Sequence, residues 1–299
     1  MANLIRIGSR GSNLALWQAK YVASQLESLG NAVEIKVIKT QGDKIQHLSF
    51  DKLEGKGFFT KELEEALLDC HIDLAVHSLK DLPTEALDQL VIAGLSQRTN
   101  PADWLLIHPQ AVQKSEVLNL KPGASVGTSS LRRKSQLSAV RADLQLDDLR
   151  GNVPTRVQKL HEGQVDGIVL AAAGLKRLNM DLSEFHIVKL NPREFVPAAG
   201  QGVLAYQTRK DDLPLRTTIK RLHHSNVARI VNVERKILKL MEGGCHLPLG
   251  AYCEQDKMGY FHVWASFAES LEKPLVRAQV SYNTTDQLAE AIIDKLKGH

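Results

Sequence analysis

Hydrophobic residues in the first third of the chain form two kinds of pattern. Short apolar runs predict four β-strands between residues 4 and 95, and the run at 72–76 is nearly continuous, as in strands covered on both faces. Apolar residues three and four positions apart predict a helix over residues 14–26 and a second one after Thr60, with Cys70 on its inner face. This alternation of strands and helices is typical of an α/β fold.

The same alternation returns in the middle of the chain, where apolar runs predict strands at residues 104–107, 125–127 and 167–171. Segments with the composition of hinges precede and follow this region, at residues 97–101 and 192–202. The middle region is therefore predicted to be inserted into the first. We expect two hinged α/β lobes like those of periplasmic binding proteins.

After residue 220 the pattern changes to that of a small α+β domain. A helix is expected over residues 225–240, two alternating strands over 260–267 and 275–280, and a last helix over 285–296. We find no internal repeat in the sequence. The predicted domains are residues 1–98 with 198–217, residues 102–194, and residues 220–299.

The stretch that follows the helix at 225–240 carries a cysteine in an unusual setting. Two glycines precede Cys245, and Pro248 prevents the helix from continuing. The thiol is therefore expected on a short, sharply bent loop that a large group can approach. The alternative is a buried thiol that only packs, which is the commoner fate of a free cysteine.

Composition excludes several classes of protein. The chain has 299 residues, a formal net charge of +4 and 5% aromatic residues, too little charge and stacking surface for a general nucleic-acid-binding protein. No apolar run approaches a membrane span, and no signal peptide is seen. Three cysteines without a CxxC pair predict neither a metal site nor disulfides. We expect a cytoplasmic protein, and nothing in the sequence requires more than a monomer.

Arginines accompany small hydroxyl residues where strands lead into helices. Arg10 and Ser12 lie at the first such turn, and Thr128 to Ser130 lead into Arg132 and Arg133 at another. A helix N-terminus attracts anions through its free N–H groups and its dipole, so these turns are candidate anion sites. The alternative for the first turn is an ordinary helix cap. Further arginines lie at or near the ends of predicted elements: Arg150, Arg156 and Arg177.

The strand at residues 72–76 runs into a charged segment. Lys80 and Asp81 lie at its carboxyl end, where ligands gather in open α/β sheets. The alternative is a solvated surface pair. Residues 40–57 lack periodicity, and two nearby glycines, Gly55 and Gly57, stand there among lysines, which favours a mobile cationic flap.

Taken together, seven stretches in the same order make the chain resemble the hydroxymethylbilane synthase (porphobilinogen deaminase) family. The resemblance spans nearly the whole chain. The stretches are Gly8 to Gln18, Gly55 to Glu64, Ala75 to Pro83, Gly127 to Arg133, Leu149 to Arg156, Ala172 to Arg177 and Glu242 to Ala251.

The resemblance implies a three-domain enzyme with a dipyrromethane cofactor, two linked pyrroles held by a thioether to Cys245. Such an enzyme adds four porphobilinogen units with loss of ammonia, and then releases the linear tetrapyrrole by hydrolysis. It also implies roles for individual residues. Asp81 is the expected acid and the group that stabilises cationic charge. The expected cofactor-binding residues are Ser78, Lys80, Thr128, Ser130, Arg132, Arg133 and Arg156. The expected substrate-binding residues are Arg10, Ser12, Gln18, Lys56, Phe59, Arg150 and Arg177.

Two departures and one rival weigh against this interpretation. Gln41 stands where the family often has arginine, and Asn13 stands where it often has proline. The main rival is a non-enzymatic hinged anion-binding protein, in which Cys245 would merely pack. The predicted third domain and the cysteine on its Gly-Gly loop favour the enzyme.

Overall fold

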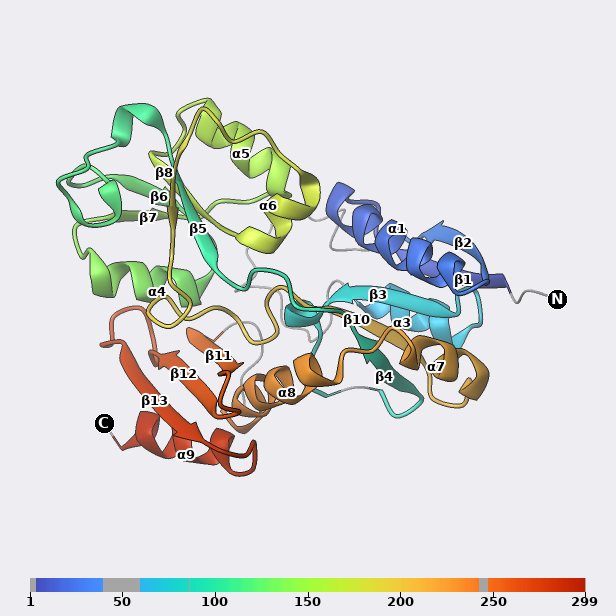
Figure 1. Cartoon of the computed structure of the whole chain (residues 1–299). Coiled ribbons are helices and arrows are strands. Elements are labelled where there is room, and N and C mark those ends of the chain that lie inside the picture. Colours follow the sequence, from blue (N-terminus) through green and yellow to red (C-terminus); the bar gives the residue numbers. More distant parts are fainter. Residues whose placement is uncertain (1–3, 40–59, 86, 242–246, 299) are drawn as a thin grey trace. The chain divides into compact units, whose positions relative to one another are not determined.

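The computed structural model of the chain describes residues 4–39, 60–85, 87–241 and 247–298. The chain forms two compact units, each built from separate segments (Figure 1). The first unit comprises Met1–Thr99 and Gly202–Ala228, and the second Asn100–Gln201 and Arg229–His299. Each unit is described by itself.

A five-stranded sheet of order β2-β1-β3-β10-β4 forms the centre of the first unit. β1 runs parallel to both β2 and β3, whereas β10 runs antiparallel to β3 and β4. The strands are β1 (Leu4–Ser9), β2 (Ala32–Val37), β3 (Leu74–Ser78), β4 (Leu90–Leu95) and β10 (Leu204–Arg209). The helices are α1 (Asn13–Ser28), α3 (Lys61–Leu68) and α7 (Leu213–Lys220).

Both faces of this sheet are covered. Residues of α1 and α7 join Ile7, Val76 and Tyr206 in one hydrophobic core, while α3 packs in a second core with Ile72 and Ala75. Burial on both faces explains why β3 reads as a nearly continuous apolar run in the sequence.

The second unit contains a sheet of order β7-β6-β8-β5-β9. β6 runs parallel to β7 and β8, and β5 runs antiparallel to β8 and β9. This order and these directions repeat those of the first sheet, with β6 in the place of β1 and β8 in the place of β3. The strands are β5 (Asp103–Ile107), β6 (Ser125–Gly127), β7 (Gln145–Asp147), β8 (Gly167–Ala171) and β9 (His186–Lys189). The helices are α4 (Leu131–Val140), α5 (Val153–His161) and α6 (Ala172–Leu178).

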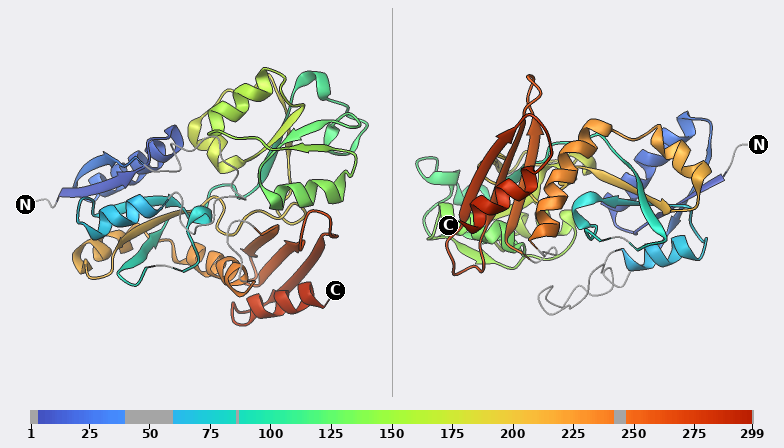
Figure 2. Two further views of the ribbon diagram at one scale, coloured as in Figure 1. Left: turned by 180° about the vertical axis from the view of Figure 1, so that it is seen from behind. Right: turned by 90° about the horizontal axis from the view of Figure 1, so that it is seen from below.

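A three-stranded antiparallel sheet also belongs to the second unit, in the order β11-β12-β13. Helices α8 and α9 lie beside it (Figure 2), and they share one core that includes Val233, Ile237, Phe261 and the fully buried Cys253. The elements are α8 (Ser225–Leu240), β11 (Leu249–Gln255), β12 (Phe261–Phe267), β13 (Val276–Tyr282) and α9 (Leu288–Lys297).

The fold class predicted from the sequence is confirmed: two α/β lobes and a small α+β region. The exact three-domain division stays a prediction. One local prediction is wrong. Cys70 is exposed and has a left-handed backbone, with φ 55°, because α3 ends at Leu68 and the chain turns back through a hydrogen bond from His71 N to Ala66 O. Across the described parts of the chain, no helix is both long and apolar enough to span a membrane.

Candidate functional site

In the first unit, the turn between β1 and α1 carries two of the predicted site residues, Arg10 and Ser12. Ser12 is the N-cap of α1, and its hydroxyl accepts a hydrogen bond from Ala15 N at 3.3 Å. The first turn of α1 contains no acidic residue, so its helix dipole is not offset there. Arg10, half-buried, immediately precedes this turn. The turn therefore contains an ordinary helix cap, and this cap does not prevent the same turn from binding an anion.

Gln18 and Ser78, predicted for different roles, lie in contact. Nε2 of Gln18 donates to Oγ of Ser78 at 3.0 Å, and Gln18 is only 3% exposed. This bond links α1 to the carboxyl end of β3. We infer that a buried Gln18 acts by holding Ser78.

His77, one residue before Ser78, begins a buried chain of polar contacts. Its Nε2 lies 3.0 Å from Oε1 of Gln207, and Nε2 of Gln207 donates to Oε1 of Glu64 at 2.9 Å. Because Gln207 presents its oxygen to the ring, Nε2 of His77 carries the proton. Burial, with a smaller contribution from Arg10, lowers the pKa of His77 to about 4. The imidazole is therefore neutral at pH 7.

Asp81 lies just beyond β3, in the single 3₁₀ turn Leu79–Asp81. Leu79 is fully buried and its N–H donates to Val203 O at 2.9 Å, which anchors the turn to the chain entering β10. The carboxylate of Asp81 is exposed, and it makes no hydrogen bond or ion pair with any described residue. It is thus held at a defined place with its oxygens available.

In the second unit, the turn between β6 and α4 has the same place in its sheet. Thr128 is buried, and its Oγ1 accepts from Ser130 N at 3.3 Å. Ser129 donates to Leu149 O at 3.0 Å, whereas the Ser130 side chain makes no cap hydrogen bond to α4. The N–H groups of the first turn of α4 are therefore not satisfied by a side-chain cap.

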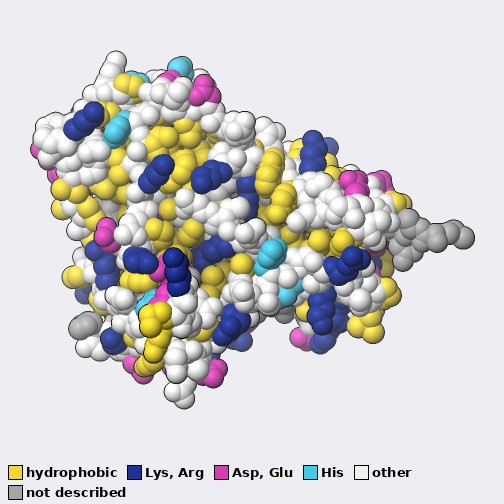
Figure 3. Space-filling model, viewed as in Figure 1, with side chains coloured by type: hydrophobic (Ala, Val, Ile, Leu, Met, Phe, Trp, Pro, Cys, Tyr) yellow, Lys and Arg dark blue, Asp and Glu magenta, His cyan; other side chains and the backbone are white. Residues whose placement is uncertain are grey.

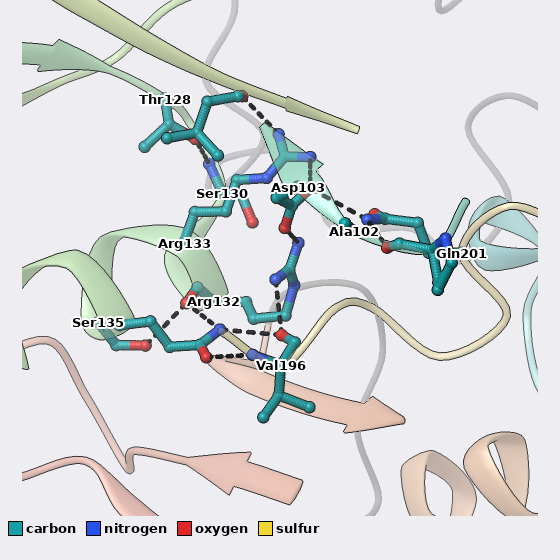
Figure 4. Close-up of polar contacts among 12 residues, drawn as sticks. Ala102, Asp103, Thr128, Ser130, Arg132, Arg133, Ser135, Val196 and Gln201 are labelled. Atoms are coloured by element: carbon teal, nitrogen blue, oxygen red, sulfur yellow. Dashed lines mark hydrogen bonds and ion pairs between the residues drawn. The ribbon is translucent and has the colours of Figure 1, made fainter. Parts of the chain in front are cut away.

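Arg132 and Arg133, the arginines at the start of α4, are buried. They are 5% and 6% exposed, and both pair with the fully buried carboxylate of Asp103 (Figure 4). Nη2 of Arg132 lies 2.9 Å from Oδ2, and Nη2 of Arg133 lies 2.7 Å from Oδ1. The sequence analysis missed Asp103. The available signal was an acidic residue at the start of an otherwise apolar strand.

The same arginines are bonded to backbone carbonyl groups. Nη1 of Arg132 donates to Val196 O at 2.8 Å, and Nη1 of Arg133 donates to Val169 O at 2.9 Å. Gln201 adds a third donor to Asp103, with Nε2 at 3.0 Å from Oδ1. Within the described chain, Nε of Arg133 is buried and has no hydrogen-bond partner.

Arg156 increases the positive charge beside this cluster. Its Nε donates to Gly151 O at 2.8 Å, and Asn152 caps α5 just before it. Burial, and then repulsion from Arg133, lowers the pKa of Arg156 to about 10. Arg132 and Arg133 therefore share the carboxylate of Asp103, and Arg156 adds a third guanidinium near Arg133. This concentration of positive charge suits an anionic ligand.

Comparison with known proteins agrees with this chemistry. Residues 5–217 match the family model described as "Porphobilinogen deaminase, dipyromethane cofactor binding domain". The chain belongs to the porphobilinogen deaminase family. A porphobilinogen deaminase of Syntrophomonas wolfei is 46% identical over 85% of this chain and 81% of that protein. The deaminase of Alkaliphilus metalliredigens is 38% identical over 97% of this chain and 92% of its own.

Among solved structures, the probable extracellular amino-acid-binding protein of an ABC transporter from Bacillus subtilis is similar in outline. It has a TM-score of 0.44 and 10% identity, and the match covers 81% of this chain and 97% of that one.

The residues present in this porphobilinogen deaminase family member fit a dipyrromethane. That group carries acetate and propionate side chains, and the second unit offers a buried, unpartnered Nε on Arg133 and a helix N-terminus without a side-chain cap. Arg177, in α6, is 8% exposed, and Arg150 is half-buried at the end of the segment before α5. No group of metal-ligating side chains is found in the ranges that the structure describes.

Three of the predicted residues, Cys245, Lys56 and Phe59, lie outside the described residues, as does Gln41. The elements that flank Cys245 are described. Glu234 of α8, fully buried, accepts from Cys253 N of β11 at 2.8 Å and from Gly200 N at 2.7 Å. One carboxylate thus joins the helix before the Cys245 segment to the strand after it.

Charged side chains are distributed differently on the surface and in the buried site. On the face seen in Figure 3, lysine and arginine side chains are spread over several elements and interspersed with acidic ones. Arg132 and Arg133 are buried, so they contribute little to any surface potential. The guanidinium groups of this pair lie inside the second unit.

Proposed function

We propose that the protein polymerises porphobilinogen to the linear hydroxymethylbilane, with loss of ammonia, on a dipyrromethane primer attached to Cys245. The observation that carries the proposal is the gathering of guanidinium groups in the second unit. There Arg132 and Arg133 pair with the buried carboxylate of Asp103, and Arg156 lies close enough to Arg133 for its pKa to be lowered. Its relatives support the same activity. They do not favour a non-enzymatic anion-binding protein.

Arginine suits this substrate because of its carboxylates. Each porphobilinogen unit brings an acetate and a propionate, so the ligand gains negative charge with every addition. A planar guanidinium can bind a carboxylate through two parallel hydrogen bonds. We infer that Arg133, Arg156 and the first turn of α4, with Thr128 and Ser130, hold the primer. When bound, the primer supplies the pyrrole position to which the first substrate unit is joined.

Asp81 is the proposed acid of the reaction. Loss of ammonia from porphobilinogen requires a proton at the departing amine, and it leaves positive charge on the pyrrole. A carboxyl group without other partners can donate that proton, and as a carboxylate it then stabilises the charge. Asp81 has the required properties because its turn is anchored while its oxygens remain available. Lys80, its neighbour, together with Arg10 and Ser12 at the start of α1, is proposed to bind carboxylates of the ligand.

Intact-protein mass tests the proposal directly. Freshly purified protein should carry extra mass equal to a dipyrromethane on the peptide that contains Cys245. Cys245→Ala should carry none and should be inactive. A fully active enzyme with an unmodified Cys245 would contradict the proposal.

We further infer a monomer that acts in the cytoplasm without nucleic acid or membrane. The net charge of only +4 and the aromatic content of 5% are both low for nucleic-acid binding and support that part of the inference alone. We also propose that residues 220–299 are a third domain, since the three-stranded sheet, α8 and α9 share their own core. Analytical ultracentrifugation tests the first inference, and limited proteolysis near residue 220 tests the second.

A further inference from the structure

We propose that Asp103 is a positioning residue for the primer-binding arginines. It acts through Arg132 and Arg133 and fixes where their guanidinium groups lie. This inference rests on the proposed function, because it takes these arginines as the groups that receive the primer's carboxylates.

The geometry shows one carboxylate serving two consecutive residues of a helix. Neighbouring side chains on an α-helix point about 100° apart, so Arg132 and Arg133 would diverge if left to themselves. Asp103 draws them together, because each of its oxygens receives one guanidinium, at 2.9 and 2.7 Å (Figure 4). Since Asp103 is the first residue of β5, the central sheet itself sets this arrangement.

Hydrogen bonds from both terminal nitrogens, Nη1 and Nη2, fix the plane of the Arg133 guanidinium group. Nη1 is bonded to Val169 O in β8 and Nη2 to Asp103 in β5, which are adjacent antiparallel strands. Nε is then left as a buried nitrogen without a partner among the residues described. A guanidinium held in this way has lost its rotational freedom before a ligand arrives, which is the condition for pre-organised binding.

Charge makes Asp103 difficult to replace. Burial lowers the pKa of Arg132 and Asp103 opposes that effect, while Arg133 lowers the pKa of both Arg132 and Arg156. Asparagine at position 103 would offer one carbonyl oxygen where the structure has three donors, from Arg132, Arg133 and Gln201. Its amide NH₂ would face at least one of them, so at least one guanidinium must move.

The test is the rate at which apo-protein, supplied with porphobilinogen, acquires the cofactor, followed by intact mass. For Asp103→Asn we expect a rate roughly 10- to 100-fold below that of the wild type, the scale seen when groups that orient binding residues are lost. The matched control is Asp166→Asn in the same unit. Asp166 pairs with Lys121 at 2.7 Å and accepts from Ser125 N at 2.9 Å, remote from α4 in the sequence. The control should lose stability and keep the wild-type loading rate.

A double variant separates positioning from simple destabilisation. Because Asp103 acts partly through Arg133, Asp103→Asn should slow loading by a smaller factor in the Arg133→Gln variant than in the wild type. Wild-type loading by Asp103→Asn, or losses that multiply in the double variant, would overturn the inference. Should Asp103→Asn not accumulate, Asp103→Glu carries the test: its carboxylate is displaced by one methylene, and loading as fast as wild type would also overturn it. Wild-type protein without cofactor mass would instead refute the proposed function.

Discussion

Gln136 holds the backbone of Val196 through both the oxygen and the nitrogen of its side-chain amide. Oε1 accepts from Val196 N at 2.6 Å, and Nε2 donates to Val196 O at 3.0 Å. Gln136 is fully buried in α4, and Val196 O also accepts from Arg132. The helix that carries the arginine pair is thus fastened to the segment before β10 by a side chain outside the family motifs considered above.

Gln136→Leu should therefore destabilise the protein. The change leaves the buried N–H of Val196 without its acceptor and removes one donor from its carbonyl, and each unsatisfied buried group costs about 1–3 kcal/mol. We expect the free energy of unfolding, from urea denaturation, to fall by about 2–4 kcal/mol. Gln158→Leu is the control, because Gln158 is exposed on α5 and should change stability by no more than about 0.5 kcal/mol. Equal effects of the two changes would show that the hydrogen bonds between Gln136 and Val196 contribute little to stability.

His77 should make stability depend on pH. Its pKa in the folded protein is lowered from 6.5 to about 4, so between these values the unfolded chain binds the proton more readily than the folded one. Stability should thus fall as the pH falls through this window, by about 3 kcal/mol between pH 7 and pH 4, at 1.36 kcal/mol per pKa unit.

Urea denaturation of His77→Asn across this range should show a flatter pH dependence than the wild type. His71→Asn, which removes an exposed histidine, should leave the dependence unchanged. A wild-type slope in His77→Asn would assign the effect to other groups.

The proposed acid role of Asp81 can be tested by changing the charge of its side chain and the position of its carboxylate separately. Asp81→Asn keeps the shape and removes both the acid and the negative charge, whereas Asp81→Glu keeps both and moves the carboxylate by about one methylene. Loss of a well-placed acid typically costs ~10²–10⁴ in rate, so the Asn variant should be nearly inactive and the Glu variant weak but measurable. Both should retain cofactor and fold because Asp81 is exposed. Near-normal turnover of Asp81→Asn, with cofactor confirmed by mass, would transfer the acid role to another group.

Arg156 should affect ligand binding more than stability. Burial and Arg133 already disfavour its charge, so Arg156→Leu relieves a repulsion while removing a partner for carboxylates. We expect kcat/KM for porphobilinogen to fall by at least about tenfold, which corresponds to one charge-assisted hydrogen bond, with little change in melting temperature. Arg216→Leu, at a half-buried position on α7 that is not among the proposed site residues, should leave turnover unchanged. Wild-type kinetics of Arg156→Leu would remove this residue from the site.

The sequence alone predicted the elements with strong patterns. The strands at residues 125–127 and 167–171 and the helix at 225–240 agree with the structure at both ends. β7 and β9, strands of three and four residues at sheet edges, were missed because they are too short to show a periodicity. The strand at 125–127 is equally short, but the hydroxyl-rich turn that follows it marked its end.

The chemical character of the site could be predicted from the sequence, but the contacts between its residues could not. Arginines beside hydroxyl residues at helix starts indicated anion binding, and Arg133 and Arg156 do lie close enough to influence each other. Asp103 could not be found in this way because its partners are 29 and 30 residues away, and only the folded sheet brings them together. Burial of Arg132 and Arg133 was likewise invisible, since arginine is usually an exposed residue.

The matching order of the two five-stranded sheets has a consequence for how the enzyme divides its work. The segment after β3 carries Asp81, and the segment after β8, its counterpart, carries Ala172 and Ala173 at the start of α6. The same architecture therefore occurs twice, and an acid occupies this position in only one of the copies. The unit without this acid, the second, contains the buried arginines Arg132 and Arg133. If the proposed roles hold, bond making and retention of the primer depend on different copies of one architecture, so that either can change without the other.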